Sequence, residues 1–130
     1  ERSLQYWLRI LDQDPQNRVI LTRAGDAYRA LGKNDEARDL YQRAMDIDYD
    51  AYAVLGLAMI HLDEGHTPRA QISLERLVEQ EPKNHRFATT LAECHLRMGF
   101  KDQAIRVLKA FQERAGANQH VDAMLARISK

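Results

Sequence analysis

The sequence predicts an all-α fold, a solenoid of antiparallel helix pairs with a capping helix at its C-terminal end. The first observation behind this prediction is a repeat, because four similar segments start 34, 33 and 34 residues apart. The second is that apolar residues within the segments follow helical spacing. Repeats of this length are typical of helix pairs that bury their apolar faces only by stacking. The four segments start at Ser3, Ala37, Ala70 and Ala104.

Residues 1–17 are expected to form the second helix of a truncated repeat, whose first helix is absent from this sequence. One face of this helix is apolar and has only part of its natural cover; it consists of Leu4, Trp7, Leu8 and Leu11. Open ends of stacked repeats tend to associate, so this face is a candidate for self-association into a homo-oligomer. The chain begins at Glu1 without a methionine, and we therefore expect a piece of a longer protein with more repeats upstream.

Three complete repeats are predicted next, within a single domain over residues 1–130. The expected repeats are residues 18–50, 51–84 and 85–118. Each is a helix, a tight turn and a second helix. The first helix of each repeat ends on a glycine, which adopts the left-handed conformation at a helix end without steric cost. These glycines are Gly32, Gly65 and Gly99.

Residues 119–130 are predicted to form a helix that caps the stack. Its apolar residues recur at helical spacing on one face only, as a terminal capping element requires. They are Val121, Met124, Leu125 and Ile128.

This spacing of small and large residues resembles the tetratricopeptide repeat (TPR) family over nearly the whole chain. The resemblance departs at Tyr49, where the turn proline and one residue are missing, and at Phe111, where the family usually has alanine. It implies a right-handed α-solenoid. The matching residues are Leu21, Ala24, Gly25, Tyr28, Gly32, Ala37 and Tyr41 in the first repeat, Val54, Leu57, Ala58, His61, Gly65, Ala70, Leu74 and Pro82 in the second, and Ala88, Leu91, Ala92, His95, Gly99, Ala104 and Leu108 in the third.

Charge and composition indicate a soluble folded protein with no affinity for nucleic acid. The 19 basic and 19 acidic side chains balance, whereas phosphate binding usually needs a basic excess. No apolar run approaches the roughly 20 residues that span a bilayer, so no direct membrane insertion is expected. The single cysteine cannot form an intramolecular disulfide, which leaves the compartment open, with the cytoplasm slightly favoured.

Cys94 and its neighbour His95 raise the question of a reactive or metal-binding site, and the repeat argues against one. His61 and His95 stand at the position of Tyr28, which packs between helices, and Cys94 stands at that of Ala27 and Ile60. Adjacent helical residues also point about 100° apart. We expect structural packing for these side chains.

No metal, cofactor or catalytic site is predicted. His61, Asp63, Glu64 and His66 are close in sequence, but they straddle the turn at Gly65 without the spacing of a four-ligand zinc site. Residues 46–57 begin like a calcium loop, yet Ala51 and Leu57 replace its glycine and glutamate. Because no phosphate loop, nucleophile elbow or paired-carboxylate cleft is present either, we expect a protein that is not an enzyme.

A partner-binding groove is predicted on the first helices, which line the concave face in the TPR family. The outward positions of the second repeat are apolar except for Asp63, and the apolar ones are Tyr52, Leu55, Met59 and Leu62. Aromatic residues and methionine suit a binding surface. Basic residues around this floor, Arg29, Arg86 and Arg97, with Leu96 beside them, would hold acidic groups of a peptide or an amphipathic helix.

Two alternatives for this apolar stripe stay open. Tight curvature would bury the stripe as core instead. The register of this repeat can also shift, since Tyr52, Leu55, Gly56 and Met59 fit the family signature locally and would then point inward. The histidine register is preferred because it preserves the spacing to Gly65 and Ala70.

One TPR subclass clamps the C-terminal carboxylate of a heat-shock protein with lysines, asparagines and an arginine. The equivalent positions here hold only one basic residue, and Asp26 among them would repel a carboxylate. The sequence therefore predicts no such clamp. The five positions are Thr22, Asp26, Gly56, Arg86 and Thr90.

The predicted function is a non-catalytic scaffold that binds another protein. Two alternatives remain: self-association through the open N-terminal end, and a regulatory or targeting domain of a larger protein whose enzymatic part lies outside this chain.

Overall fold

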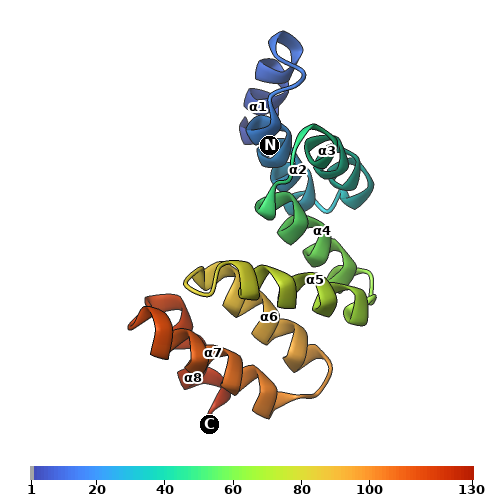
Figure 1. Cartoon of the computed structure of the whole chain (residues 1–130). Helices are drawn as coiled ribbons and strands as arrows, with labels where there is room; N and C mark the ends of the chain where they lie inside the picture. Colours follow the sequence, from blue (N-terminus) through green and yellow to red (C-terminus); the bar gives the residue numbers. More distant parts are fainter. Residues whose placement is uncertain (1) are drawn as a thin grey trace. The chain divides into compact units, whose positions relative to one another are not determined.

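The computed structural model describes residues 2–130, and these residues form eight α-helices and no strand (Figure 1). The all-α prediction is confirmed. The helices are α1 (Arg2–Gln13), α2 (Arg18–Ala30), α3 (Asn34–Ile47), α4 (Ala51–Asp63), α5 (Thr67–Gln80), α6 (His85–Arg97), α7 (Lys101–Ala115) and α8 (Gln119–Ile128).

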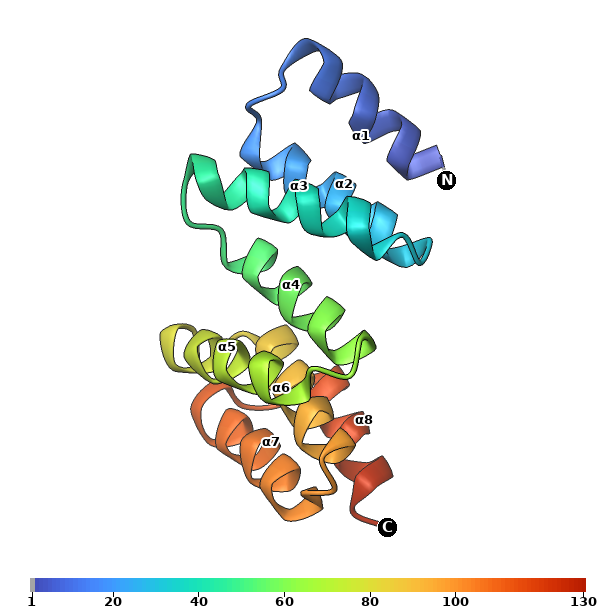
Figure 2. The same ribbon diagram turned by 90° about the vertical axis from the view of Figure 1, so that its right-hand side faces the viewer.

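The chain divides into two compact units, and the division falls inside α4. Unit 1 extends to Ile60, and unit 2 is His61–Lys130. In unit 1, α2 packs on both α1 and α3 (Figure 2). In unit 2, α6 packs on α5, α7 and α8, and α7 also packs on α8.

Glycine turns end the first helix of each pair. Gly32, Gly65 and Gly99 have φ values of 77°, 83° and 81°, the left-handed conformation that the sequence predicts for them. Each turn also closes a hydrogen bond from the N–H after the glycine to the carbonyl five residues earlier. The bonded pairs are Lys33 to Tyr28 at 3.0 Å, His66 to His61 at 2.8 Å and Phe100 to His95 at 2.8 Å.

Side-chain caps begin four of the helices. The side-chain oxygens of Asn17, Asn84 and Asn118 accept hydrogen bonds from the first backbone N–H groups of α2, α6 and α8. The residue before α4 is Asp50 and not an asparagine. Its carboxylate caps α4 by accepting from the N–H groups of Tyr52 at 2.9 Å and Ala53 at 3.2 Å. Such caps satisfy backbone donors that the helix itself leaves without partners.

The core of unit 1 centres on Tyr41 of α3, which is fully buried. Its ring lies against Gly25 of α2 and Gly56 of α4, two positions where a Cβ atom would collide with the ring. Small residues therefore let α2 and α4 approach this ring closely. The other buried apolar residues of this core are Leu4, Leu11, Leu21, Ala24, Ala37, Leu40, Ala44, Ala53 and Ile60.

The core of unit 2 follows the expected pattern of small residues facing large ones. Ala88 and Ala92 of α6 lie against α7 and α8, whose larger side chains fill the space between the helices. The capping helix α8 contributes its apolar face to this core. The buried members from α7 and α8 are Ala104, Leu108, Phe111, Val121 and Leu125.

Candidate functional site: a cationic pocket between α6 and α8

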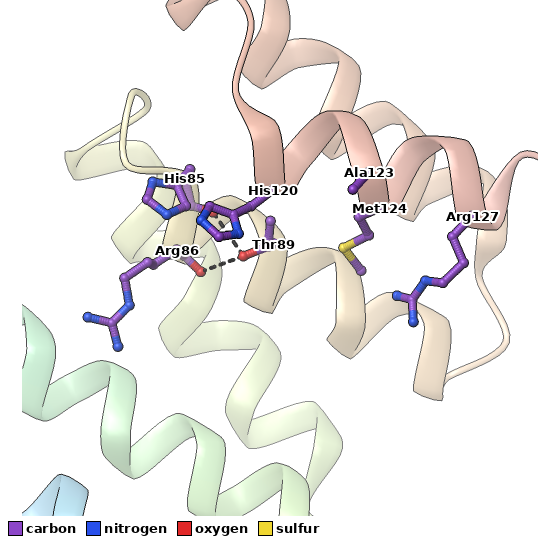
Figure 3. A pocket seen from close by; sticks show the side chains of 7 residues that line it. All are labelled: His85, Arg86, Thr89, His120, Ala123, Met124 and Arg127. Carbon is purple, nitrogen blue, oxygen red and sulfur yellow. Dashed lines mark hydrogen bonds between the residues drawn. The ribbon is translucent and has the colours of Figure 1, made fainter.

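An open pocket of about 590 Å³ lies between α6 and α8 in unit 2 (Figure 3). Both helices begin at its edge, since the Asn84 cap precedes α6 and the Asn118 cap precedes α8. The caps fix where the first turns of the two helices lie. The pocket is lined by His85, Arg86, Thr89, His120, Ala123, Met124 and Arg127.

The lining combines cations and imidazoles with an apolar strip. Arg86 on α6 and Arg127 on α8 are both exposed, and Ala123 and Met124 lie along α8 between its imidazole and its guanidinium (Figure 3). No carboxylate is among the residues that line the pocket. The pocket therefore presents a positive surface to an acidic group, with space for an apolar side chain beside it.

Two histidines join the helices at one end of the pocket. The rings of His85 and His120 are stacked, with centroids 4.9 Å apart and planes 8° from parallel. Below them, the Thr89 hydroxyl donates to the backbone carbonyls of His85 at 2.9 Å and Arg86 at 3.2 Å (Figure 3). The ring stack joins the first turn of α6 to α8, whereas the Thr89 hydrogen bonds lie within α6.

Among the residues predicted for the groove, unit 2 holds four. Arg86 lines the pocket, whereas Arg97 donates a 3.1 Å hydrogen bond to the backbone carbonyl of Leu62 at the end of α4. Leu62 is buried, and Leu96 is half-buried against the unit 2 core. Of the four, Arg86 is the residue that lines this pocket.

Unit 1 holds the other four predicted groove residues. On α4, Tyr52 is 40% exposed and Met59 is half-buried, but Leu55 is 2% exposed. Arg29 on α2 donates from Nε to the Tyr41 hydroxyl at 3.4 Å, so its guanidinium has an internal partner. Tyr52 and Met59 are thus the members of the apolar stripe that reach the surface.

The predicted self-association face on α1 is partly covered. Leu4 and Leu11 are buried in the unit 1 core, and Trp7 and Leu8 pack on it while remaining half-exposed. The guanidinium of Arg23 lies 5.8 Å from the Trp7 ring centroid and shields part of it. Helix α2 therefore supplies more cover for α1 than the sequence suggested.

The five positions of the carboxylate clamp serve other roles. The Thr22 hydroxyl donates to Asp50 at 2.9 Å, and Asp26 accepts from the Tyr41 hydroxyl at 2.5 Å. Gly56 lies against the Tyr41 ring, and the Thr90 hydroxyl donates to the Arg86 carbonyl at 2.7 Å. Arg86 alone among them faces a pocket.

Cys94 and His95 are both buried in unit 2. The Cys94 thiol lies 3.7 Å from the Thr67 carbonyl. Burial, and then the negative charge of Glu75, raise the pKa of the thiol, which keeps it protonated and unreactive. Burial lowers the pKa of His95 against the opposing effect of Glu75, so its imidazole is held neutral. Both residues pack as structural side chains.

In the turn between α4 and α5, three side chains that the sequence did not predict to form a metal site lie close together. One ligating atom each of His61, Glu64 and His66 lies within 4.8 Å of the others. His61 is half-buried, and the other two are exposed.

Sequence reasoning missed most of the residues that line the pocket, among them His85, His120, Met124 and Arg127. Met124 was assigned to the apolar face of the capping helix, and α8 was not considered as part of a binding surface. A signal was nevertheless present, since both histidines follow a capping asparagine within two residues, at Asn84 and Asn118. Because α6 packs on α8, histidines near the starts of these two helices come together.

Packed helix pairs with left-handed glycine turns define a helical-repeat protein. Tetratricopeptide repeat family profiles match residues 61–128 and residues 20–51. The chain belongs to the tetratricopeptide repeat family. Over the part of the chain that the structure describes, no helix has the length and apolar character needed to cross a membrane.

Several known proteins are similar to this chain. ER membrane protein complex subunit 2-A of Xenopus laevis is 29% identical over 119 residues, and the matched region spans 91% of this chain and 40% of that protein. A thermophilic TPR protein of Thermus thermophilus is 19% identical, with a TM-score of 0.85 over 97% of this chain and 71% of that one. The structure of PcrH in complex with the chaperone binding region of PopB is 28% identical, with a TM-score of 0.70 over 86% of this chain and 91% of that one.

Proposed function

We propose that this chain is a non-catalytic protein-interaction module that binds an acidic segment of a partner protein in the pocket between α6 and α8. One observation carries the proposal: Arg86 and Arg127 flank an apolar strip in a pocket with no carboxylate in its lining. An aspartate or glutamate of the partner would pair with either guanidinium, and an apolar neighbour would rest on Met124.

The similarity to PcrH supports binding of a protein segment as the general function. PcrH was solved with a region of another protein bound, and this chain covers 91% of that structure. The amphibian relative is a subunit of a larger complex, and this chain spans 40% of its length. We therefore propose that the chain acts within a longer protein, as the binding part of an assembly.

We also propose that the repeats run over residues 18–50, 51–84 and 85–118, before a cap at 119–130. In unit 1, Tyr52 and Met59 would form a separate binding surface on α4, since both reach the solvent. The buried positions of Leu55 and Leu62 favour a role for these two residues in packing.

The acidic-segment proposal is tested with a labelled peptide that alternates glutamate and leucine and a matched peptide that alternates lysine and leucine. Fluorescence anisotropy would measure their binding to the chain and to the Arg86→Glu/Arg127→Glu variant. We expect the chain to bind the acidic peptide and not the basic one, and the variant to lose that binding. Because the contact is between charges, added salt should also weaken it.

The control is Arg43→Glu/Arg76→Glu, which changes the net charge equally at two exposed arginines outside the pocket. Retained binding by this control would assign the effect to the pocket. Equal loss in both variants would contradict the proposal, because a general charge effect would then explain it. A second variant, Tyr52→Ala/Met59→Ala, tests the α4 surface separately.

Self-association through α1 is a distinct proposal that rests on the half-exposed Trp7 and Leu8. Sedimentation of the chain and of Trp7→Lys over a range of concentrations tests it. A dimer of the chain that the variant does not form would support the proposal. A monomer at all concentrations would rule it out.

A further inference from the structure

The turn that joins α4 to α5 brings residues 61 and 66 together through its backbone. The N–H of His66 donates to the carbonyl of His61 at 2.8 Å, and the N–H of Gly65 donates to the carbonyl of Leu62 at 3.2 Å. With Gly65 at a φ of 83°, this is the closing motif of a helix end. Two side chains that lie five apart in sequence therefore start from neighbouring backbone positions.

The chain contains the same turn three times, which allows a direct comparison of its side chains. At the positions of His61, Glu64 and His66, the first turn carries Tyr28, Leu31 and Lys33, and the third carries His95, Met98 and Phe100. Since all three turns close the same backbone bonds, the fold does not require ligating side chains here. The second turn differs from the others in having three.

The three groups are close enough to share one metal ion. One ligating atom of each lies within 4.8 Å of the others, and the imidazole centroids of His61 and His66 are 6.0 Å apart. Metal bonds to imidazole nitrogen and carboxylate oxygen are about 2.0–2.2 Å long, so small rotations of the exposed Glu64 and His66 side chains would complete the set.

We propose that His61, Glu64 and His66 bind one divalent first-row transition metal ion, of which Zn²⁺ is the representative. Two imidazoles and a carboxylate suit this class of ion, whereas Ca²⁺ and Mg²⁺ prefer oxygen ligands alone. Three protein ligands leave a coordination position open, which water or a group of another molecule can fill. The site stands apart from the proposed peptide pocket, and neither proposal depends on the other.

Calorimetric titration of the whole chain with Zn²⁺ tests the proposal. The variants are His66→Phe and Glu64→Met, because the third turn carries Phe100 and Met98 at these positions and tolerates them. We expect one ion per chain for the unaltered protein, and about tenfold or greater loss of affinity in each variant, since even the loss of outer contacts costs metal sites about 10–100-fold. Circular dichroism would confirm that the variants remain helical.

Glu113→Met is the matched control for Glu64→Met, since it removes an exposed carboxylate that lies outside both the turn and the pocket. It should bind Zn²⁺ as the unaltered chain does. The visible absorption of bound Co²⁺ gives a second readout, and it should appear in the control and be absent from His66→Phe. Absence of saturable binding by the unaltered chain would overturn the proposal, as would unchanged affinity in both turn variants.

Discussion

The hydroxyl of Tyr41 donates a 2.5 Å hydrogen bond to the carboxylate of Asp26, from the middle of the unit 1 core. The same hydroxyl accepts from Arg29 at 3.4 Å. A carboxylate and a guanidinium of α2 are thus tied to a ring that is buried between α2 and α4. These two charged residues of α2 thus bond to α3 within unit 1.

Replacing the Tyr41 hydroxyl should therefore destabilise the protein. We expect Tyr41→Phe to lower the free energy of unfolding by about 1.5–3 kcal/mol, the usual range for a hydrogen bond to a charged group. Urea denaturation followed by circular dichroism measures this change. Tyr6→Phe is the control, because it removes the same atom from a ring that is 55% exposed, and it should change stability little. Equal effects of the two variants would contradict the role assigned to this bond.

The Tyr41 phenol should also resist ionisation at high pH. Burial, and then the hydrogen bond to Asp26, raise its pKa above the ordinary value of 10.0. The neutral phenol is thus favoured in the folded state. Its contribution to stability is fully present below pH 10 and falls as the pH rises further, since the unfolded chain ionises first. Absorbance titration at the phenolate band should show one of the five tyrosines ionising last, and Tyr41→Phe should remove that step.

Adding a methyl group at Gly56 should disrupt the contact with Tyr41. A Cβ at this position would overlap the Tyr41 ring, and overpacking of this kind costs about 1–3 kcal/mol. Gly56→Ala should therefore lower the thermal midpoint, although alanine is the better helix former. In a Tyr41→Leu background the same change should cost nothing or stabilise, because the ring is gone. A cost that persists without the ring would show that Tyr41 is not the cause.

Asp50 is expected to be the most sensitive acidic residue of unit 1. It caps α4, accepts from the Thr22 hydroxyl at 2.9 Å and pairs with the Arg18 guanidinium at 2.7 Å while only 7% exposed. Asp50→Ala should cost about 2–4 kcal/mol, from the lost cap and the loss of a buried charged partner. Asp50→Asn keeps an oxygen for the cap and should cost less. Asp46→Ala, at an exposed position, is the control for chemical denaturation.

Cys94 should react slowly with thiol reagents in the folded protein. The side chain is fully buried, and burial raises the pKa of its thiol, so both access and thiolate are limited. We expect labelling by a disulfide reagent at neutral pH to be complete within seconds in denaturant and to be far slower without it. Rapid labelling of the folded chain would contradict the buried position.

Much of the fold was predictable because it depends on local rules. Glycine at a helix end and asparagine before a helix start act within a few residues, and Gly65 and Asn84 behave as those rules require. The exposure of the α4 stripe was not predictable, because α4 is apolar on all sides and its sequence alone cannot rank its faces. Leu55 is consequently buried while Tyr52 is exposed.

The candidate sites were harder to predict because they combine distant or unusually spaced residues. Asp50 resembled part of a calcium loop, but its partners Arg18 and Thr22 lie about 30 residues away and become visible only in the structure. His61 and His66 lie five residues apart in sequence. On one helix face this spacing would not bring the two imidazoles together, but the turn at Gly65 does. The pocket needed the cap helix α8 to pack on α6, a contact between non-adjacent elements.

The turns at Gly32, Gly65 and Gly99 close the same backbone hydrogen bonds with one left-handed glycine each. Evolution can therefore exchange the residues around such a turn while leaving the architecture intact. A tyrosine and a lysine occupy one copy, two histidines another, and a histidine and a phenylalanine the third. Each of these turns can therefore carry a different set of side chains, and with it a different chemical function, on an unchanged backbone.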